Sequence, residues 1–348
     1  MRLPCLLAAS LALAACHDQA NGGGAGLREQ ITAVGSSTVY PFTTIIAERF
    51  VAADPDAKAP VIESTGTGAG MKLFCAGIGA AHPDIENASR RMKKSEYRDC
   101  VAHGAGDILE IPIGIDGIAF AESKRGPAMR LTTIDLYRAL AAHPGGRPNS
   151  ARTWQDVNPA LPAVPIQVYG PPATSGTRDA LAELILMRGC DAVEPGAEAL
   201  SHRDPEAHRV FCARVRDDGA YIDAGENDNL IVQKLQSNPN AIGVFGYSYL
   251  EENKATVRGV TINEVEPSYA AIAADRYPGS RLLYLYVKKA HLDAIPGLRQ
   301  FLKLYAANWG QDGPLVRRGL IAAPAGIQET ARSIIAHETV LDPASLPS

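Results

Sequence analysis

Short apolar runs alternate along the chain with segments whose apolar residues recur at helical spacing. Apolar runs of strand length occupy residues 31–35, 59–63 and 166–170, and a turn rich in hydroxyl groups follows each. Behind the first turn, Phe42, Ile46 and Phe50 recur every four residues, a spacing that predicts a helix. The alternation of strands and helices predicts an α/β fold with mainly parallel strands.

The rest of the chain continues this pattern. The run 108–120 is extended and interrupted by glycines, which suits a strand that passes between two domains with a hinge near 114–117. We expect the strand at 281–287 to pair with it. The last residues, 341–348, are expected to fray. Further helices are predicted over 71–75, 132–142, 226–237 and 295–309, and a further strand over 241–247.

The glycine-rich stretch 64–72 has the features of an anion-binding turn. Three glycines let the backbone approach a ligand closely, and a helix start offers unpaired N–H groups to an anion. The glycine spacing fits neither a Walker A loop nor a dinucleotide fingerprint, so the stretch alone is equally consistent with an ordinary turn. Because hydroxyl-rich turns also follow the strands at 31–35 and 166–170, we interpret the three turns as surrounding an anion with neutral donors.

The first residues have the features of an export signal. Arg2 precedes an apolar segment, 3–15, that is too short to span a bilayer as a helix. The segment 13–16 has the form of a bacterial lipobox, so we interpret 1–15 as a signal peptide, Cys16 as the lipidated first residue and 16–26 as a tether. The alternative is an ordinary secretory signal with a chance cysteine. Both interpretations predict export.

Composition narrows the class of protein. The chain is 46% hydrophobic and 21% charged, and its length favours two domains. Its net charge is −4, with 34 basic and 38 acidic residues; without Arg2 the balance is 33 to 38, or −5. Such a chain has no electrostatic footprint for nucleic acid, and anion binding has to be local.

Four cysteines lie outside the signal region: Cys75, Cys100, Cys190 and Cys212. In an oxidising compartment an even number suggests disulfides, and pairing of nearest neighbours gives Cys75–Cys100 and Cys190–Cys212. The alternative is a metal site with His202 and His208. Because no CxxC pair is present and the histidines lie in a polar stretch, we favour disulfides, solvated histidines, no metal and no cofactor.

The order of the motifs resembles the phosphate-binding subunit of bacterial high-affinity phosphate ABC transporters. The resemblance spans nearly all of the mature chain. It rests on Val34-Gly35-Ser36-Ser37-Thr38, Ser64-Thr65-Gly66-Thr67-Gly68, Asn87-Ala88-Ser89-Arg90, Ile115-Asp116-Gly117-Ile118, Ser175-Gly176-Thr177-Arg178, Asn238-Pro239-Asn240-Ala241-Ile242-Gly243, Leu283-Tyr284-Leu285-Tyr286-Val287 and Gly319-Leu320-Ile321. It implies a type II periplasmic-binding-protein fold of two α/β lobes. The first lobe would hold 27–114 and 280–345, the second 115–279, with crossings near 112–117 and 277–281.

The resemblance also implies which residues hold the anion. The phosphate-binding residues would be Ser36, Ser37, Thr38, the Val39 amide, Thr67, Ser89, Arg90, Ser175, Gly176, Thr177 and Arg178. Some family members have an aspartate, which accepts the phosphate proton, where this chain has Arg90, and an arginine where it has Pro171. Asp116, Asp179 and Asp228 are therefore candidate acceptors.

The resemblance implies a place and partners for the protein. The ligand would be inorganic phosphate, and the partners an ABC permease and its ATPase. We expect a monomer in the periplasm or cell envelope, anchored to a membrane by its lipid. The alternatives are a binder of sulfate or molybdate, an adhesin on the same fold, and a secreted phosphatase or serine hydrolase. The sequence contains neither a Gly-x-Ser-x-Gly nor a His-Glu-x-x-His motif, which argues against an enzyme.

Overall fold

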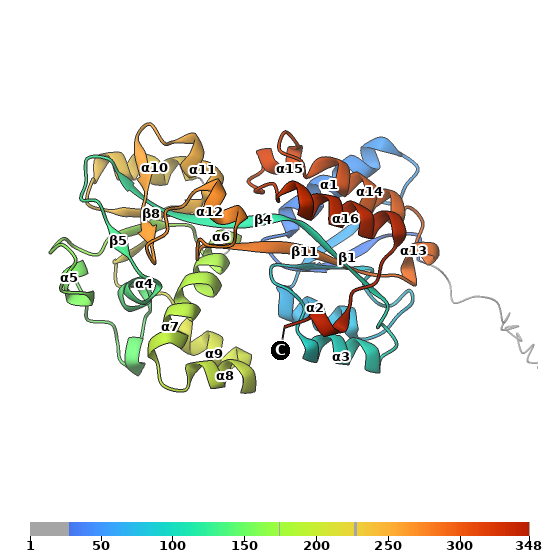
Figure 1. Ribbon diagram of the computed structural model, residues 1–348, viewed down its shortest axis with the longest axis horizontal. Helices are drawn as coiled ribbons and strands as arrows, with labels where there is room; N and C mark the ends of the chain where they lie inside the picture. Colours follow the sequence, from blue (N-terminus) through green and yellow to red (C-terminus); the bar gives the residue numbers. More distant parts are fainter. Residues whose placement is uncertain (1–27, 174, 226–227, 348) are drawn as a thin grey trace, which may run out of the picture.

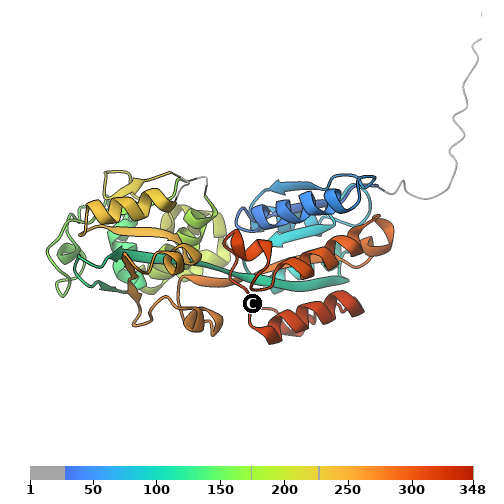
Figure 2. The same cartoon turned by 90° about the horizontal axis from the view of Figure 1, so that it is seen from above.

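Two α/β lobes lie side by side in the computed structural model, which describes residues 28–173, 175–225 and 228–347 (Figures 1 and 2). The predictions for the signal peptide, Cys16 and the tether lie outside the described residues. Two long strands, β4 (Ile108–Ser123) and β11 (Ser280–Lys288), run from one lobe into the other. No helix within the described ranges is both long and apolar enough to cross a membrane.

One mixed sheet runs through both lobes in the order β2-β1-β3-β11-β4-β8-β6-β7, with β9 also paired to β4. Its other strands are β1 (Thr32–Gly35), β2 (Val61–Ser64), β3 (Ile85–Ala88), β6 (Val168–Gly170), β7 (Tyr221–Asp223), β8 (Ile242–Gly246) and β9 (Val257–Gly259). Strands of the predicted strand-turn-helix units pair in parallel, whereas β4 and β11 are antiparallel to their neighbours. A separate pair joins β5 (Arg130–Leu131) to β10 (Thr261–Ile262).

The crossing strands change partners where the lobes meet. Strand β4 pairs with β11 as far as Gly117, opposite Ser280, and with β8 from Ile118 onward. The glycines of this segment make room for the chain beside it, because a Cβ on Gly114 would lie 2.6 Å from the side chain of Leu320. The predicted pairing of the two strands is confirmed. The lobe boundaries and the hinge motion stay predictions.

Helices cover both faces of the sheet in each lobe (Figure 2). The first lobe holds α1 (Tyr40–Ala53), α2 (Thr67–Cys75), α3 (Lys94–Ala102), α13 (His291–Ala294), α14 (Leu298–Asn308), α15 (Pro314–Arg317) and α16 (Ala325–His337). The second holds α4 (Thr133–Leu140), α5 (Trp154–Val157), α6 (Gly176–Ala180), the π-helical segment η2 (Leu181–Leu186), α7 (Met187–Val193), α8 (Ala197–Arg203), α9 (Pro205–Cys212), α10 (Asp228–Ser237), α11 (Tyr247–Glu252) and α12 (Tyr269–Ala273). Short 3₁₀ turns lie at η1 (Pro144–Gly146) and η3 (Pro343–Ser345).

Each lobe has its own apolar core. In the first lobe α1 and α14 pack on the sheet, and the ring of Phe50 meets that of Phe301 edge-on, with centroids 5.8 Å apart. In the second lobe the core forms around β4, β8 and the helix of α6, η2 and α7, and Trp154 is fully buried there. A further cluster lies between α2 and α3 of the first lobe. Separate cores in the two lobes allow each lobe to behave as a unit.

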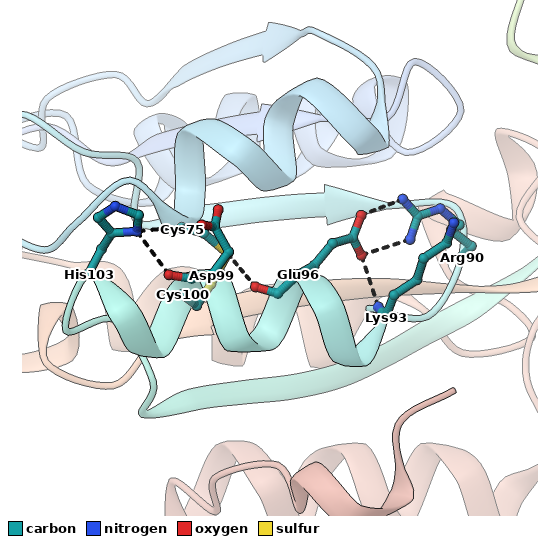
Figure 3. Close-up of a disulfide and its surroundings, with 7 residues drawn as sticks. All are labelled: Cys75, Arg90, Lys93, Glu96, Asp99, Cys100 and His103. Carbon is teal, nitrogen blue, oxygen red and sulfur yellow. Dashed lines mark hydrogen bonds and ion pairs between the residues drawn. A yellow bond between two sulfur atoms is a disulfide. The ribbon is translucent and has the colours of Figure 1, made fainter. Parts of the chain in front are cut away.

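Two disulfides join neighbouring helices, as predicted. Cys75–Cys100 links α2 to α3 (Figure 3), and Cys190–Cys212 links α7 to α9. All four cysteines are buried. Each bridge closes a short loop, of 25 and 22 positions, so nearest-neighbour pairing was the correct interpretation.

Two local predictions are wrong. Helix α2 begins at Thr67, four residues earlier than its apolar residues indicate, so Gly68 and Gly70 lie inside the helix. The C-terminal segment is not frayed: Leu346 is 3% exposed in the core beneath α3, and Arg91 donates to the carbonyl of Ser345 (2.7 Å). Long-range packing, which the local pattern does not encode, orders this segment.

Candidate functional site

Two of the predicted turns, one from each lobe, touch where the lobes meet. Ser37, in the turn before α1, donates a hydrogen bond from its Oγ to the carboxylate of Asp179 in α6. A Cβ added to Gly176 would lie 3.0 Å from the Cα of Thr38, so the two backbones are in contact as well. The Ser37–Asp179 contact joins residues 142 positions apart. The fold therefore brings together turns that sequence analysis could identify only separately.

Ser36 shapes the turn that precedes α1. Its N–H donates to the carbonyl of Asn87 (2.7 Å), and its Oγ accepts from the N–H of Thr38 (3.1 Å). The helix then begins at Tyr40, and Val39 at the N-cap has no side-chain acceptor. A helix start whose N–H groups lack a side-chain cap is suited to bind an anion.

The turn that precedes α2 lies beside the first one. Thr67 Oγ1 accepts from the N–H of Ser89 (3.1 Å) and is 3.0 Å from Ser89 Oγ. The carbonyl of Gly35 accepts from the N–H groups of Thr65 (2.9 Å) and Gly66 (2.8 Å), which fixes the second turn against the first. The structure thus brings the predicted residues Thr67 and Ser89 together.

Two glycines make this close approach of the turns feasible. Gly35 has a φ of +123°, and a Cβ there would lie 2.2 Å from the carbonyl oxygen of Asn87. A Cβ on Gly70 would lie 2.6 Å from the Cα of Gly35. Any larger residue at either position would push the two helix starts apart.

A buried carboxyl that sequence analysis missed lies under these glycines. Glu86 on β3 is fully buried, and its oxygens lie against Gly35 and Gly70. Neither oxygen finds a hydrogen-bond partner among the residues that the structure describes. Burial raises the pKa of Glu86 well above its usual value; Glu96 adds to the shift and Arg90 opposes it. The group therefore favours its neutral, protonated form.

In the second lobe, Ser175 caps the start of α6. Its Oγ accepts from the N–H of Thr177 (3.3 Å). The guanidinium of Arg178 lies over the ring of Tyr221, 4.0 Å from its centroid, and the Tyr221 hydroxyl donates to the carbonyl of Pro171 (2.7 Å). Arg178 thus contacts its own lobe, and its role as the charged donor stays a prediction.

Arg90 is held by an acidic partner at the start of α3. Its two terminal nitrogens donate to the two oxygens of Glu96 (2.9 and 2.7 Å), and Glu96 also accepts from the N–H of Lys93 (2.9 Å), as Figure 3 shows. Burial disfavours the charged form of Glu96, but the hydrogen bonds and charge of Arg90 prevail and lower the pKa of Glu96. Glu96 therefore occupies the two terminal nitrogens of Arg90 with which an anion would otherwise form a bidentate pair.

Arg281 on β11 is a second residue that sequence analysis missed. Its Nη2 donates to Thr38 Oγ1 (3.3 Å), its Nε donates to Asp116 (3.2 Å), and its Nη1 donates to Glu183 in η2. The side chain is only 8% exposed. The one signal in the sequence was a single arginine at the start of an apolar strand.

The three candidate proton acceptors lie in different places. Asp179 contacts Ser37 in the predicted turn. Asp116 on β4 pairs with Arg281; burial raises the pKa of Asp116, and the charge and hydrogen bond of Arg281 oppose this shift. Asp228 is the first residue of α10. Asp179 therefore contacts a predicted phosphate-binding residue.

A cavity of about 280 Å³ opens beside Arg281 between the lobes, and arginines dominate its polar lining. Arg90 and Arg91 come from the first lobe and Arg188 from the second. Burial, with the nearby charge of Arg281, lowers the pKa of Arg188, while Asp275 opposes the shift. Asp275 lines the cavity as well, and Arg90 and Arg91 are paired with Glu96 and Glu110.

The described residues contain one cluster with metal-ligand chemistry, formed by Asp191, His208 and Cys212. Cys212 is bound in a disulfide, and His208 Nε2 lies 2.7 Å from Asp191 Oδ1. His202 is exposed as predicted, but the prediction of a solvated His208 is wrong: it is 1% exposed. The amphipathic helix α9 turns His208 inward, on the same face as Cys212.

Comparison with known proteins places this geometry in a family. Residues 20–308 match the model of the PBP superfamily domain. Protein SphX of Synechococcus elongatus is 31% identical over 297 residues, which cover 82% of this chain and 75% of that protein. The phosphate-binding protein PstS of Staphylococcus saprophyticus is 27% identical over 325 residues, which cover 91% of this chain and 88% of the other.

A solved structure shows the same architecture. The crystal structure of a possible phosphate binding protein from Planctomyces limnophilus has a TM-score of 0.71 and 27% identity, and the match covers 89% of this chain and 99% of that one. The predicted two-lobed fold is confirmed. The predicted resemblance is confirmed by relatives named phosphate-binding protein PstS, and the chain belongs to the PBP superfamily.

Proposed function

We propose that the protein binds inorganic phosphate between its lobes and delivers it to the permease of an ABC transporter. The observation that carries the proposal is the contact between Ser37 and Asp179, which joins the hydroxyl-rich starts of α1 and α6 across the lobes. Relatives named phosphate-binding protein PstS support phosphate as the ligand.

The proposed ligand groups are neutral donors around helix starts, supplemented by charge. They are Ser36, Ser37, Thr38, the Val39 N–H, Thr67, Ser89, Ser175, Gly176 and Thr177, with Arg90 and Arg178 as cationic candidates. In a cleft with little water, hydrogen bonds to a charged ligand are roughly twice as strong as neutral ones. Donors from both lobes make the ligand a bridge, so it stabilises the closed form, and the permease and its ATPase respond to that form.

Discrimination against sulfate requires an acceptor, because only phosphate keeps a proton near neutral pH. Asp179 contacts a proposed ligand residue, because it accepts a hydrogen bond from Ser37. We assign it the phosphate proton. On this assignment Asp179→Asn weakens phosphate binding and leaves sulfate binding unchanged or stronger, whereas Asp116→Asn and Asp228→Asn do not change the preference.

The protein is proposed to act outside the cytoplasm as a monomeric lipoprotein in the periplasm or cell envelope. The signal at 1–15 and the lipobox cysteine, Cys16, support export and a lipid anchor. Binding rather than catalysis is proposed. Mass spectrometry of the mature N-terminus tests the anchor: a lipid on Cys16 is expected, and an unlipidated start elsewhere would contradict it.

Titration calorimetry with phosphate, sulfate and arsenate tests the binding function. We expect one saturable site for phosphate per chain, competition by arsenate and weaker binding of sulfate. Tighter binding of sulfate or molybdate would favour the oxyanion alternative. Turnover of a phosphomonoester by the purified protein would contradict the binding-only proposal.

A further inference from the structure

We propose that Arg281 is the cationic ligand of the bound anion, and that Glu183 occupies its guanidinium until the anion arrives. This inference rests on the proposed function and names a residue of the same site. It differs from the expectation drawn from sequence, which placed the positive charge on Arg90 and Arg178.

The contacts of the three arginines favour Arg281. Arg90 has both terminal nitrogens on Glu96, and Arg178 lies over the ring of Tyr221 in its own lobe. Arg281 reaches Thr38 Oγ1 (3.3 Å), a proposed phosphate ligand. The positive charge that is in contact with the proposed ligand groups is therefore the one on β11.

Arg281 is placed where both lobes meet. It lies opposite Asp116 in the register of the two crossing strands, and the carboxylate of Asp116 holds its Nε (3.2 Å). From this fixed point the guanidinium reaches Thr38 of the first lobe and Glu183 of the second. An anion bound to this group is thus held where the crossing strands pair, between groups of both lobes.

The charges around Arg281 indicate an exchange of partners. One guanidinium faces two carboxylates, so the site without an anion carries a surplus negative charge. The side chain of Asp116 on β4 is 16% exposed, whereas that of Glu183 is 38% exposed and therefore loses less hydration when it leaves the guanidinium. Glu183 also lies in a π-helical segment, a conformation that is rare and frequent at functional sites. An arriving anion replaces Glu183 on Nη1.

The guanidinium of Arg281 has N–H groups that its contacts with the described residues do not use. Each terminal nitrogen carries two N–H groups, and the contacts within the described chain use one on each. The cavity of about 280 Å³ beside it gives a small anion access to these donors.

The test compares three variants of the full chain by calorimetric titration with inorganic phosphate. Arg281→Met should weaken binding roughly a hundredfold, because charge-assisted hydrogen bonds are lost. Glu183→Gln should strengthen it by roughly threefold to fivefold, the range for release of a half-exposed ion pair. A purely structural ion pair predicts no such gain. Arg216→Met is the matched control: Arg216 is 4% exposed and paired with Asp218 away from the cleft, so its loss should lower stability without changing affinity.

Opposite changes in affinity for Arg281→Met and Glu183→Gln would support the inference. Wild-type affinity in Arg281→Met, or no gain in Glu183→Gln, would overturn it, as would an equal loss of affinity in Arg216→Met. If Arg281→Met does not fold, the phosphate affinity of Glu183→Gln tests the inference alone, since this variant leaves Arg281 paired with Asp116. A wild-type protein that binds no phosphate would instead overturn the proposed function.

Discussion

Replacing the buried Glu86 by glutamine should make the protein increasingly more stable than wild type as the pH rises. The carboxyl is fully buried against Gly35 and Gly70 and has no hydrogen-bond partner in the described chain. Burial, aided by Glu96 and opposed by Arg90, raises the pKa of Glu86 well above its ordinary value of 4.5. Glutamine keeps the shape of the side chain and does not ionise.

The size of the effect follows from proton linkage. In the unfolded chain the carboxyl ionises near pH 4.5, whereas in the folded protein it keeps its proton to higher pH. The stabilisation by the bound proton is thus fully present below pH 4.5 and is lost as the pH rises toward the pKa of the folded state. Within this window the wild type loses about 1.4 kcal/mol of unfolding free energy per pH unit relative to the variant.

Urea denaturation of both proteins at several pH values measures this difference. The unpaired amide of the glutamine changes the free energy of unfolding by an amount that does not depend on pH. The prediction therefore concerns the slope of the free-energy difference against pH. Glu48→Gln, on the exposed face of α1, is the control and should follow the wild type. A difference between Glu86→Gln and wild type that stays constant from about pH 4 to pH 7 would refute the reasoning.

Three further outcomes are expected. Thr177→Val should weaken phosphate binding roughly tenfold to a hundredfold with little change in melting temperature; the reverse pattern would show that the hydroxyl only serves the helix. Serines in place of Cys190 and Cys212 should lower the free energy of unfolding by about 3 kcal/mol, since the closed loop is short, and an unchanged urea midpoint would contradict this. Asp179→Ala removes the contact with Ser37, so small-angle scattering should find a larger radius without phosphate; an equal radius would mean that this contact does not hold the lobes together.

The features that could be predicted from sequence are those that depend on neighbouring residues. The hydroxyls of Ser36 and Ser175 and the glycine before α2, Gly66, mark helix starts, because a helix start needs its turn chemistry within a few positions. The same holds for the disulfides, whose partners lie 25 and 22 positions apart. These local signals were enough to give some of the elements, the α/β class and the turns of the candidate site.

The residues that sequence analysis missed depend on distant partners. Arg281 meets Thr38, Asp116 and Glu183 across 243, 165 and 98 positions, and no local pattern marks these encounters. The predicted exposure of His208 was wrong for the same reason. Polar neighbours in sequence indicate exposure, but packing of the helix decides which of its faces is buried.

A crystal structure of the protein grown with phosphate tests the central claim most directly. The account predicts one tetrahedral anion between the lobes, within hydrogen-bond distance of the turn before α1 and of the start of α6, with a nitrogen of Arg281 on one of its oxygens. An empty space between these turns at saturating phosphate, or an anion bound only elsewhere, would contradict it.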